Sequence, residues 1–229
     1  MSKNLIEAKN LVKVYRDGNM YFKALNNVSF EIKKGESVAI IGKSGSGKST
    51  LMHLLAALDK PNEGEILING QNIAKMKKRD LNKLRNRTFG FVFQQFFMNP
   101  KDTVLQNVIL PLKIGGVSSR KRKDIALKAL EAVELTDKAK NKASNLSGGQ
   151  KQRVCVARAI ANSPEIIFAD EPTGNLDSKT SKKIEDLLFG LNKDKGITLI
   201  IVTHDESLAQ KCDRQIRIQD GQIISKGEK

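Results

Sequence analysis

Residues 42–49 read GKSGSGKS and fit the spacing G-x-x-x-x-G-K-[ST] directly after an apolar run. Glycines at these positions let the backbone turn its N–H groups toward phosphate oxygens. The lysine places a cation near the β- and γ-phosphates, where it can also act in catalysis, and the serine hydroxyl is a ligand for Mg²⁺. The segment therefore predicts a nucleotide-binding loop, named the phosphate loop here. Its expected nucleotide-binding residues are Gly42, Lys43, Ser44, Gly45, Ser46, Gly47, Lys48, Ser49 and Thr50.

Two acidic residues end a second apolar run, IIFADE at residues 166–171. Asp170 is expected to hold Mg²⁺ through its water shell, and Glu171 is the candidate general base for an attacking water. Two carboxylates that cap the end of a strand are the structural alternative, which the phosphate loop in the same chain disfavours. Gln94 follows the run FGFVF and is a candidate for contacting both Mg²⁺ and the water. His204 follows TLIIVT and is a candidate for the γ-phosphate.

A second pair of glycines, in NLSGGQ at residues 145–150, stands directly before a helical pattern. The N-terminus of a helix is a ready anion site because its first N–H groups are free and its dipole is positive there. Ser147 is the expected cap of this helix. No arginine in the sequence is an evident partner for the γ-phosphate in the first site, so its charge stabilisation is incomplete without a further group.

The elements that must position these residues fall into two kinds. Four nearly continuous apolar runs, at 37–41, 89–93, 165–169 and 198–202, are typical of strands buried on both faces, and each is followed by polar residues. Ligands of open α/β sheets bind beyond the carboxyl ends of the strands, so one site at one sheet edge is expected. In the first third, apolar residues alternate, as at Val28, Phe30 and Ile32, which predicts an antiparallel sheet with one wet side. Asp220-Gly221 predicts a hairpin.

The predicted organisation is one α/β domain spanning residues 1–229. Residues 1–95 and 161–229 are expected to form a core with an antiparallel β subdomain. Residues 96–160 have helical spacing, for example in RKRKDIALKALEAVEL, and are expected to form an inserted helical lobe. Phe96, Phe97 and Met98 either fill the junction between core and lobe or line a groove for a partner.

The net charge of +15 comes from scattered lysines and from two clusters, at residues 75–87 and 118–123. Three explanations remain open: a solvated basic surface, an anionic lipid surface or membrane partner, or nucleic acid, which the scarcity of arginine disfavours. Cys155 and Cys212 are expected to be reduced thiols, without a disulfide or a metal. No apolar run is long enough to span a bilayer and no signal peptide is evident, so a cytoplasmic protein is expected.

In order and identity, the motifs resemble those of ATP-binding-cassette (ABC) ATPases over nearly the whole chain: the phosphate loop, Gln94, LSGGQ, IIFADE, GNLD (174–177) and His204. The resemblance implies a P-loop NTPase fold with a RecA-like core, and ATP hydrolysis with Mg²⁺ in a head-to-tail homodimer. Each ATP would be held by the phosphate loop of one subunit and LSGGQ, the signature segment, of the other. Tyr15 matches the aromatic that stacks on adenine, and Lys43 departs from the Pro or small residue that relatives often carry at its position. The residues that would act in trans are Ser147, Gly148, Gly149, Gln150 and Asp177.

Within that family, FGFVFQQF, NVILPL and FADEPTGNLD are similar to ATPases of lipoprotein-release, macrolide-export and antimicrobial-peptide-efflux systems, the LolD- and MacB-like branch. This resemblance implies a separate integral-membrane permease as partner, and a place on the inner face of the cell membrane. Specific nucleic-acid binding is not expected. The alternatives are a cell-division ATPase that regulates a permease-like partner and a non-transport ABC ATPase that acts on nucleic acid.

Overall fold

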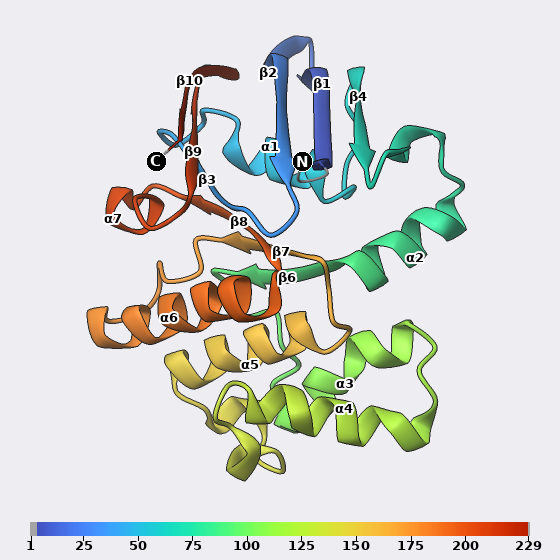
Figure 1. Cartoon of the computed structure of the whole chain (residues 1–229), viewed down its shortest axis with the longest axis vertical. Coiled ribbons are helices and arrows are strands. Elements are labelled where there is room, and N and C mark those ends of the chain that lie inside the picture. Colours follow the sequence, from blue (N-terminus) through green and yellow to red (C-terminus); the bar gives the residue numbers. More distant parts are fainter. Residues whose placement is uncertain (1–3, 229) are drawn as a thin grey trace. The chain divides into compact units, whose positions relative to one another are not determined.

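In the computed structural model, residues 4–228 are described and fall into two units (Figure 1). Unit 1 runs from the N-terminus to Arg85 and from Thr198 to the C-terminus, and unit 2 comprises Asn86–Ile197. The helical lobe predicted at residues 96–160 lies within unit 2. Among the described residues, no helix is both long and apolar enough to cross a membrane.

The first third of the chain forms an antiparallel sheet in unit 1. Its strands are β1 (Asn4–Asp17), β2 (Met20–Lys33), β4 (Glu63–Ile68) and β5 (Gln71–Asn72), in the order β2-β1-β4-β5. In β2 the residues Val28, Phe30 and Ile32 are buried while Glu31 between them is exposed, so the predicted wet and dry faces are confirmed. The short helix η1 (Ile73–Lys75) follows β5, and α2 (Lys78–Thr88) leads into unit 2.

A second group of strands in unit 1 carries the phosphate loop. β3 (Ser37–Ile41) is parallel to β8 (Thr198–Thr203) and to β9 (Arg214–Gln219), and β10 (Gln222–Glu228) is antiparallel to β9. Every residue of β3 and β8 is buried, as their continuous apolar runs predict. Asp220 and Gly221, with φ of 49° and 73°, form the predicted hairpin turn, since this turn type needs positive φ at both positions. Helices α1 (Lys48–Leu55) and α7 (Glu206–Ala209) complete the unit.

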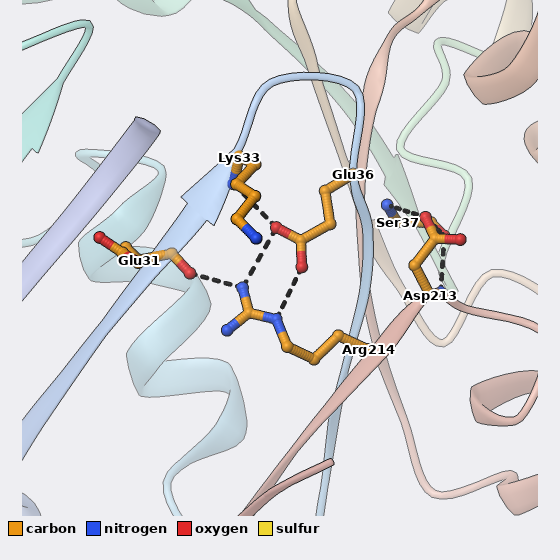
Figure 2. Close-up of polar contacts among 6 residues, drawn as sticks. All are labelled: Glu31, Lys33, Glu36, Ser37, Asp213 and Arg214. Atoms are coloured by element: carbon orange, nitrogen blue, oxygen red, sulfur yellow. Dashed lines mark hydrogen bonds and ion pairs between the residues drawn. The ribbon is translucent and has the colours of Figure 1, made fainter. Parts of the chain in front are cut away.

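Partly buried polar contacts fix the beginning of β3 against the beginning of β9 (Figure 2). Arg214 Nε donates to Glu36 Oε1 at 2.6 Å, and the same guanidinium donates to the carbonyl of Glu31 at the end of β2. The Ser37 hydroxyl donates to Asp213 Oδ2 at 2.7 Å and accepts from the Asp213 N–H at 2.9 Å. Because the charges of Arg214 and Glu36 are paired and hydrogen-bonded, their partial burial is tolerated. β3 has five residues, so anchoring its start also sets where the phosphate loop begins.

Unit 2 pairs two parallel strands, β6 (Phe89–Phe93) and β7 (Ile166–Asp170), and contains four longer helices within its described residues. These are α3 (Val104–Ile114), α4 (Ser119–Glu131), α5 (Gly148–Ile160) and α6 (Ser178–Lys195), with short helices η2 (Thr136–Lys138) and η3 (Ala143–Asn145). α5 packs against β6 and against α3 and α4 (Figure 1). A Cβ at Gly90 would lie 2.6 Å from the carbonyl oxygen of Ala159, so glycine permits the close approach of β6 to α5.

Neither cysteine forms a disulfide and both are buried, which leads to a prediction about the reactivity of Cys155. Burial raises the pKa of the Cys155 thiol from 9.0 to about 11, against a smaller opposing effect of Arg158. Because the thiolate is the reactive form, Cys155 should react with a disulfide reagent at pH 8 at least about 100-fold more slowly in the native chain than in the unfolded chain. Mass spectrometry of peptides labelled over time would measure this. Equal rates in both states would contradict the buried placement.

Candidate functional site

The phosphate loop connects the end of β3 to the first turn of α1. Lys48 Nζ donates to the carbonyl oxygens of Gly42 and Lys43, at 2.9 Å each, so the ammonium group is held against the loop backbone. Lys43, Ser44, Gly45 and Ser49 are exposed, while Thr50 is half-buried. A loop with an exposed rim, a fixed cation and a helix N-terminus behind it has the features of a phosphate site.

Ser46 differs from its neighbours because its side chain is buried. Its N–H donates to the carbonyl of Lys43 at 3.2 Å, and its own carbonyl accepts from the N–H of Gly221 at 3.0 Å. Its hydroxyl oxygen is buried and has no hydrogen-bond partner among residues 4–228. Ser46 therefore ties the phosphate loop to the β9–β10 turn and does not present its side chain to solvent.

Gly47 should tolerate no side chain. Its φ is 105°, and a Cβ would lie 2.5 Å from the carbonyl oxygen of Ala24 and 3.1 Å from Leu25 Cδ2. Gly47→Ala should therefore lower the free energy of unfolding by about 1–3 kcal/mol for the overlap, beyond the cost of its φ. Gly45→Ala is the comparison, because Gly45 also has positive φ but has nothing within 4 Å. Gly45→Ala should lower the free energy of unfolding by about 1–2 kcal/mol, for its positive φ alone. Urea unfolding of both variants measures the difference, and equal losses would contradict the close contact.

Tyr15, the candidate for adenine stacking, is held by its neighbours in unit 1. The residue is 39% exposed, its hydroxyl donates to Asp59 Oδ2 at 3.1 Å, and Lys13 Nζ lies 5.0 Å from the ring centroid. Lys13 also forms an ion pair with Asp59 at 2.7 Å. Burial raises the pKa of Asp59, but the hydrogen bond from Lys13 and other donors hold it below its ordinary value. Sequence reasoning missed Lys13 and Asp59. The sequence did offer a signal for Lys13: it stands two positions before Tyr15, and residues two apart in a strand lie on the same face.

His204 follows β8 in unit 1 and is exposed. The next residue, Asp205, caps α7 by accepting from the N–H groups of Ser207 at 2.8 Å and Leu208 at 3.2 Å. The N–H of Asp205 donates to the hydroxyl of Thr203 at 3.0 Å. His204 is thus presented to solvent between two fixed neighbours.

In unit 2 the parallel register pairs Phe93 with Asp170, so Gln94 and Glu171 follow two neighbouring strands at the same point. The structure therefore brings Gln94 and the Asp170-Glu171 pair to one edge. Gln94 Nε2 donates to Asn175 Oδ1 at 3.3 Å, and Asn175 Nδ2 donates to the carbonyl of Gln94 at 3.2 Å. Glu171 has φ of 44°, a left-handed conformation that a glutamate rarely adopts, and such backbone strain clusters at functional sites.

The signature segment forms the N-terminus of α5, as predicted. Ser147 Oγ accepts from the N–H of Gln150 at 3.3 Å, and Gln150 Oε1 accepts from the N–H of Ser147 at 2.9 Å, which makes a capping box. Ser147 and Gly148 are exposed, so the positive end of a 13-residue helix faces solvent. A Cβ at Gly149 would lie 2.3 Å from Thr180 Cγ2 on α6, so a side chain there would have to displace Thr180.

Asp177 lies at the start of α6 and is exposed. Its carboxylate accepts from the N–H of Thr180 at 3.0 Å, and hydrogen bonds from Thr180 lower the pKa of Asp177. The residue is therefore an ionised helix cap within its own subunit. Through the contact of Gly149 with Thr180, this cap is packed beside the signature segment.

The donor atoms expected to hold Mg²⁺ are of the right kind for that ion. They are the Ser49 hydroxyl in unit 1 and the Asp170 carboxylate and Gln94 amide oxygen in unit 2, all of them hard oxygen ligands. Gln94 uses its NH₂ group toward Asn175, which leaves its Oε1 as the ligand atom. In the described part of the chain, no cluster of three or more His, Cys, Asp or Glu side chains could hold a metal by itself. A small set of oxygen ligands suits an ion that keeps several waters.

A family model described as ABC transporter matches residues 25–174. The chain belongs to the ABC transporter family. Its fold is that of solved members: MJ0796, described as a bacterial ABC transporter cassette, is 45% identical in its dimeric structure, with a TM-score of 0.89 over 97% of this chain and 98% of that one. A second MJ0796 structure, dimeric and bound to ADP and Pi, is 44% identical with the same TM-score and coverage.

A more distant member of the ABC family is cbiO1 from Clostridium perfringens, which is part of the ABC transporter complex cbiONQ. It is 30% identical, with a TM-score of 0.88 over 98% of this chain and 88% of that one. The predicted ABC fold, with its antiparallel sheet, parallel strands and helical part, is therefore confirmed.

Proposed function

We propose that this cassette hydrolyses ATP as a head-to-tail homodimer and so drives a separate membrane permease. The observation that carries the proposal is the exposed capping box at the start of α5. It presents a positive helix end to solvent, with the N–H groups of Gly148 and Gly149 outside the capping box, in a chain whose phosphate loop already has its own lysine and helix. A second anion site of this kind would serve to bind the γ-phosphate of an ATP molecule that is held by another copy of the chain.

In this proposal, the phosphate loop and Lys48 bind the phosphates, and Tyr15 stacks on adenine. Glu171 accepts a proton from the water that attacks the γ-phosphate, while Gln94 orients that water and His204 donates to the γ-phosphate. Mg²⁺, held by Ser49, Gln94 and Asp170, would neutralise charge on the β- and γ-phosphates. The bond from the γ-phosphorus to the bridging oxygen breaks, and ADP and inorganic phosphate leave.

The signature residues Ser147, Gly148, Gly149 and Gln150 of one subunit act on the ATP of the other, and Asp177 crosses the same interface. Their hydrogen bonds would stabilise the charge of the transferring phosphoryl group, a role otherwise filled by an arginine. MJ0796, a cassette similar over nearly the whole length, forms dimers, which supports this arrangement. Two bound ATP molecules then hold the dimer closed, and hydrolysis opens it.

The permease partner is proposed because cbiO1 is part of a transporter complex and because this chain presents apolar side chains beside Gln94. Phe97 is 66% exposed with φ of 42°, while Phe96 and Met98 are half-buried. We place the chain in the LolD- and MacB-like branch, on the inner face of the cell membrane, and propose export or efflux of a lipoprotein, macrolide or peptide. Membrane permeases that co-purify with the tagged chain, identified by mass spectrometry, would test the branch.

The ATPase activity is tested on the purified chain. With Mg²⁺, it should release phosphate from ATP, and Lys48→Met should reduce kcat/KM about 10²–10³-fold, as expected for loss of one strong phosphate contact. Lys121→Met, which removes an exposed lysine of α4, is the matched control and should leave the rate unchanged. Phosphate release that is absent from the unaltered chain, or unaffected by Lys48→Met, would contradict the proposed activity.

A further inference from the structure

Gln152 is a buried polar residue of α5 with no role in the mechanism above. The residue is 1% exposed. Its Nε2 donates to the carbonyl oxygen of Phe93 at 3.2 Å and to that of Pro172 at 2.7 Å. Phe93 directly precedes Gln94, and Pro172 directly follows Glu171. One amide group within unit 2 therefore connects α5 to both segments that carry candidate catalytic side chains.

The chemistry of these contacts requires a primary amide. Two carbonyl oxygens need two N–H donors, and the NH₂ group of glutamine supplies both from one atom. The other atom of the amide, Oε1, is buried and has no hydrogen-bond partner among residues 4–228. A buried acceptor without a donor is unfavourable. An apolar side chain of equal length would avoid that cost but would leave both carbonyls without this donor.

The helix that carries Gln152 begins at the signature segment. Gly148 is the first residue of α5, so Gln152 lies about 6 Å along the axis, little more than one turn. Further along the same helix, Cys155 Sγ donates to the carbonyl of Phe96 at 3.1 Å, and Arg158 donates to the carbonyl of Phe97 at 2.7 Å. These side chains, at spacing three, form one stripe that binds the 93–97 segment through its backbone. Any displacement of α5 must therefore move or break these contacts.

We propose that Gln152 is a positioning residue that couples the signature segment of a subunit to Gln94 and Glu171 of the same subunit. The inference rests on the proposed function, in which the signature binds the ATP of the partner subunit. That binding would fix the N-terminus of α5. Gln152, fixed with the helix, would then hold the Phe93 and Pro172 carbonyls in place through its two hydrogen bonds. ATP in one site would thus order the catalytic side chains of the other, and such coupling is reciprocal.

The test is the ATP dependence of hydrolysis by the full chain with Gln152→Met, which keeps the side-chain length and removes both donors. We expect ATP binding to the monomer to stay within twofold of the unaltered chain, since no phosphate contact is lost. The kcat should fall at least about tenfold, and the Hill coefficient should fall from about 2 to about 1. Gln152→Leu is the second variant, because it also removes both donors and introduces no buried charge; it should show the same two losses.

Arg153→Met is the matched control on the same helix. Arg153 also donates to two carbonyl oxygens, those of Val133 at 3.1 Å and Glu134 at 3.5 Å, but these belong to neither catalytic segment. The Arg153→Met variant should retain the Hill coefficient of the unaltered chain. Thermal unfolding of all variants reports any common loss of stability, which alone would not change the Hill coefficient.

The outcomes separate this inference from the proposed function. If the unaltered chain dimerises and hydrolyses ATP while Gln152→Met or Gln152→Leu keeps its kcat and Hill coefficient, the coupling is overturned and the function stands. Equal losses in Arg153→Met would also overturn it. If the unaltered chain shows neither dimer nor hydrolysis, the proposed function fails, and the coupling fails with it.

Discussion

Replacing Glu171 with Gln should slow ATP turnover about 10²–10⁴-fold, the usual contribution of a general base. The amide keeps the shape of the carboxylate but cannot accept a proton from the attacking water. ATP binding should persist, because the phosphate loop and Tyr15 lie in unit 1 and are unchanged. Steady-state phosphate release and ATP affinity, measured on the same preparation, would separate these two effects.

Glu131→Gln is the matched control for this experiment. Glu131 ends α4, is exposed, and loses the same charge on substitution without belonging to the proposed site. It should hydrolyse ATP at the parental rate. If Glu171→Gln also did so, another group would have to act as base, and the assignment of Glu171 would be wrong.

Replacing Ser147 with Arg should abolish ATP-dependent dimerisation while monomers still bind ATP. The exposed cap of α5 would be replaced by a long cationic side chain at the surface that meets the partner. Loss of the hydrogen bond from Gln150 should also lower the free energy of unfolding by about 1 kcal/mol, too little to unfold the chain. Size-exclusion chromatography with and without ATP measures dimerisation, and nucleotide titration measures ATP binding by the monomer.

Ser118→Arg provides the comparison, because Ser118 caps α4, is exposed and makes no side-chain cap hydrogen bond. It should dimerise with ATP as the unaltered chain does. Equal loss of ATP binding and of dimerisation in Ser147→Arg would place the signature in the site of its own subunit and contradict the action in trans.

The sequence predicts the elements around the site well where the pattern is local. The runs at 37–41, 89–93 and 198–202 match β3, β6 and β8 to within one residue, because strands buried on both faces need continuous apolar residues. The capping box of Ser147 and Gln150 joins residues three apart, so its signal is complete within six letters of sequence. The Asp220-Gly221 hairpin is local in the same way.

The contacts that hold the site residues could not be predicted in this way. Gln152 reaches carbonyls 59 and 20 residues away, and backbone carbonyls carry no sequence signal. Asp59, which accepts from Tyr15 across 44 residues, has the ordinary appearance of a loop aspartate. In the helical pattern of α5, Gln152 looks like a solvated position, and its burial depends on β6 and on the segment after β7, whose carbonyl at Pro172 it contacts.

The mass of the Glu171→Gln variant in the presence of ATP, measured by sedimentation equilibrium, tests the central claim most directly. Because hydrolysis is strongly slowed, ATP should hold two copies together, and the mass should be twice the 25.4 kDa of the monomer. With ADP, or with Ser147→Arg added, it should return to the monomer value. A monomer at saturating ATP would contradict the account that two copies share each nucleotide.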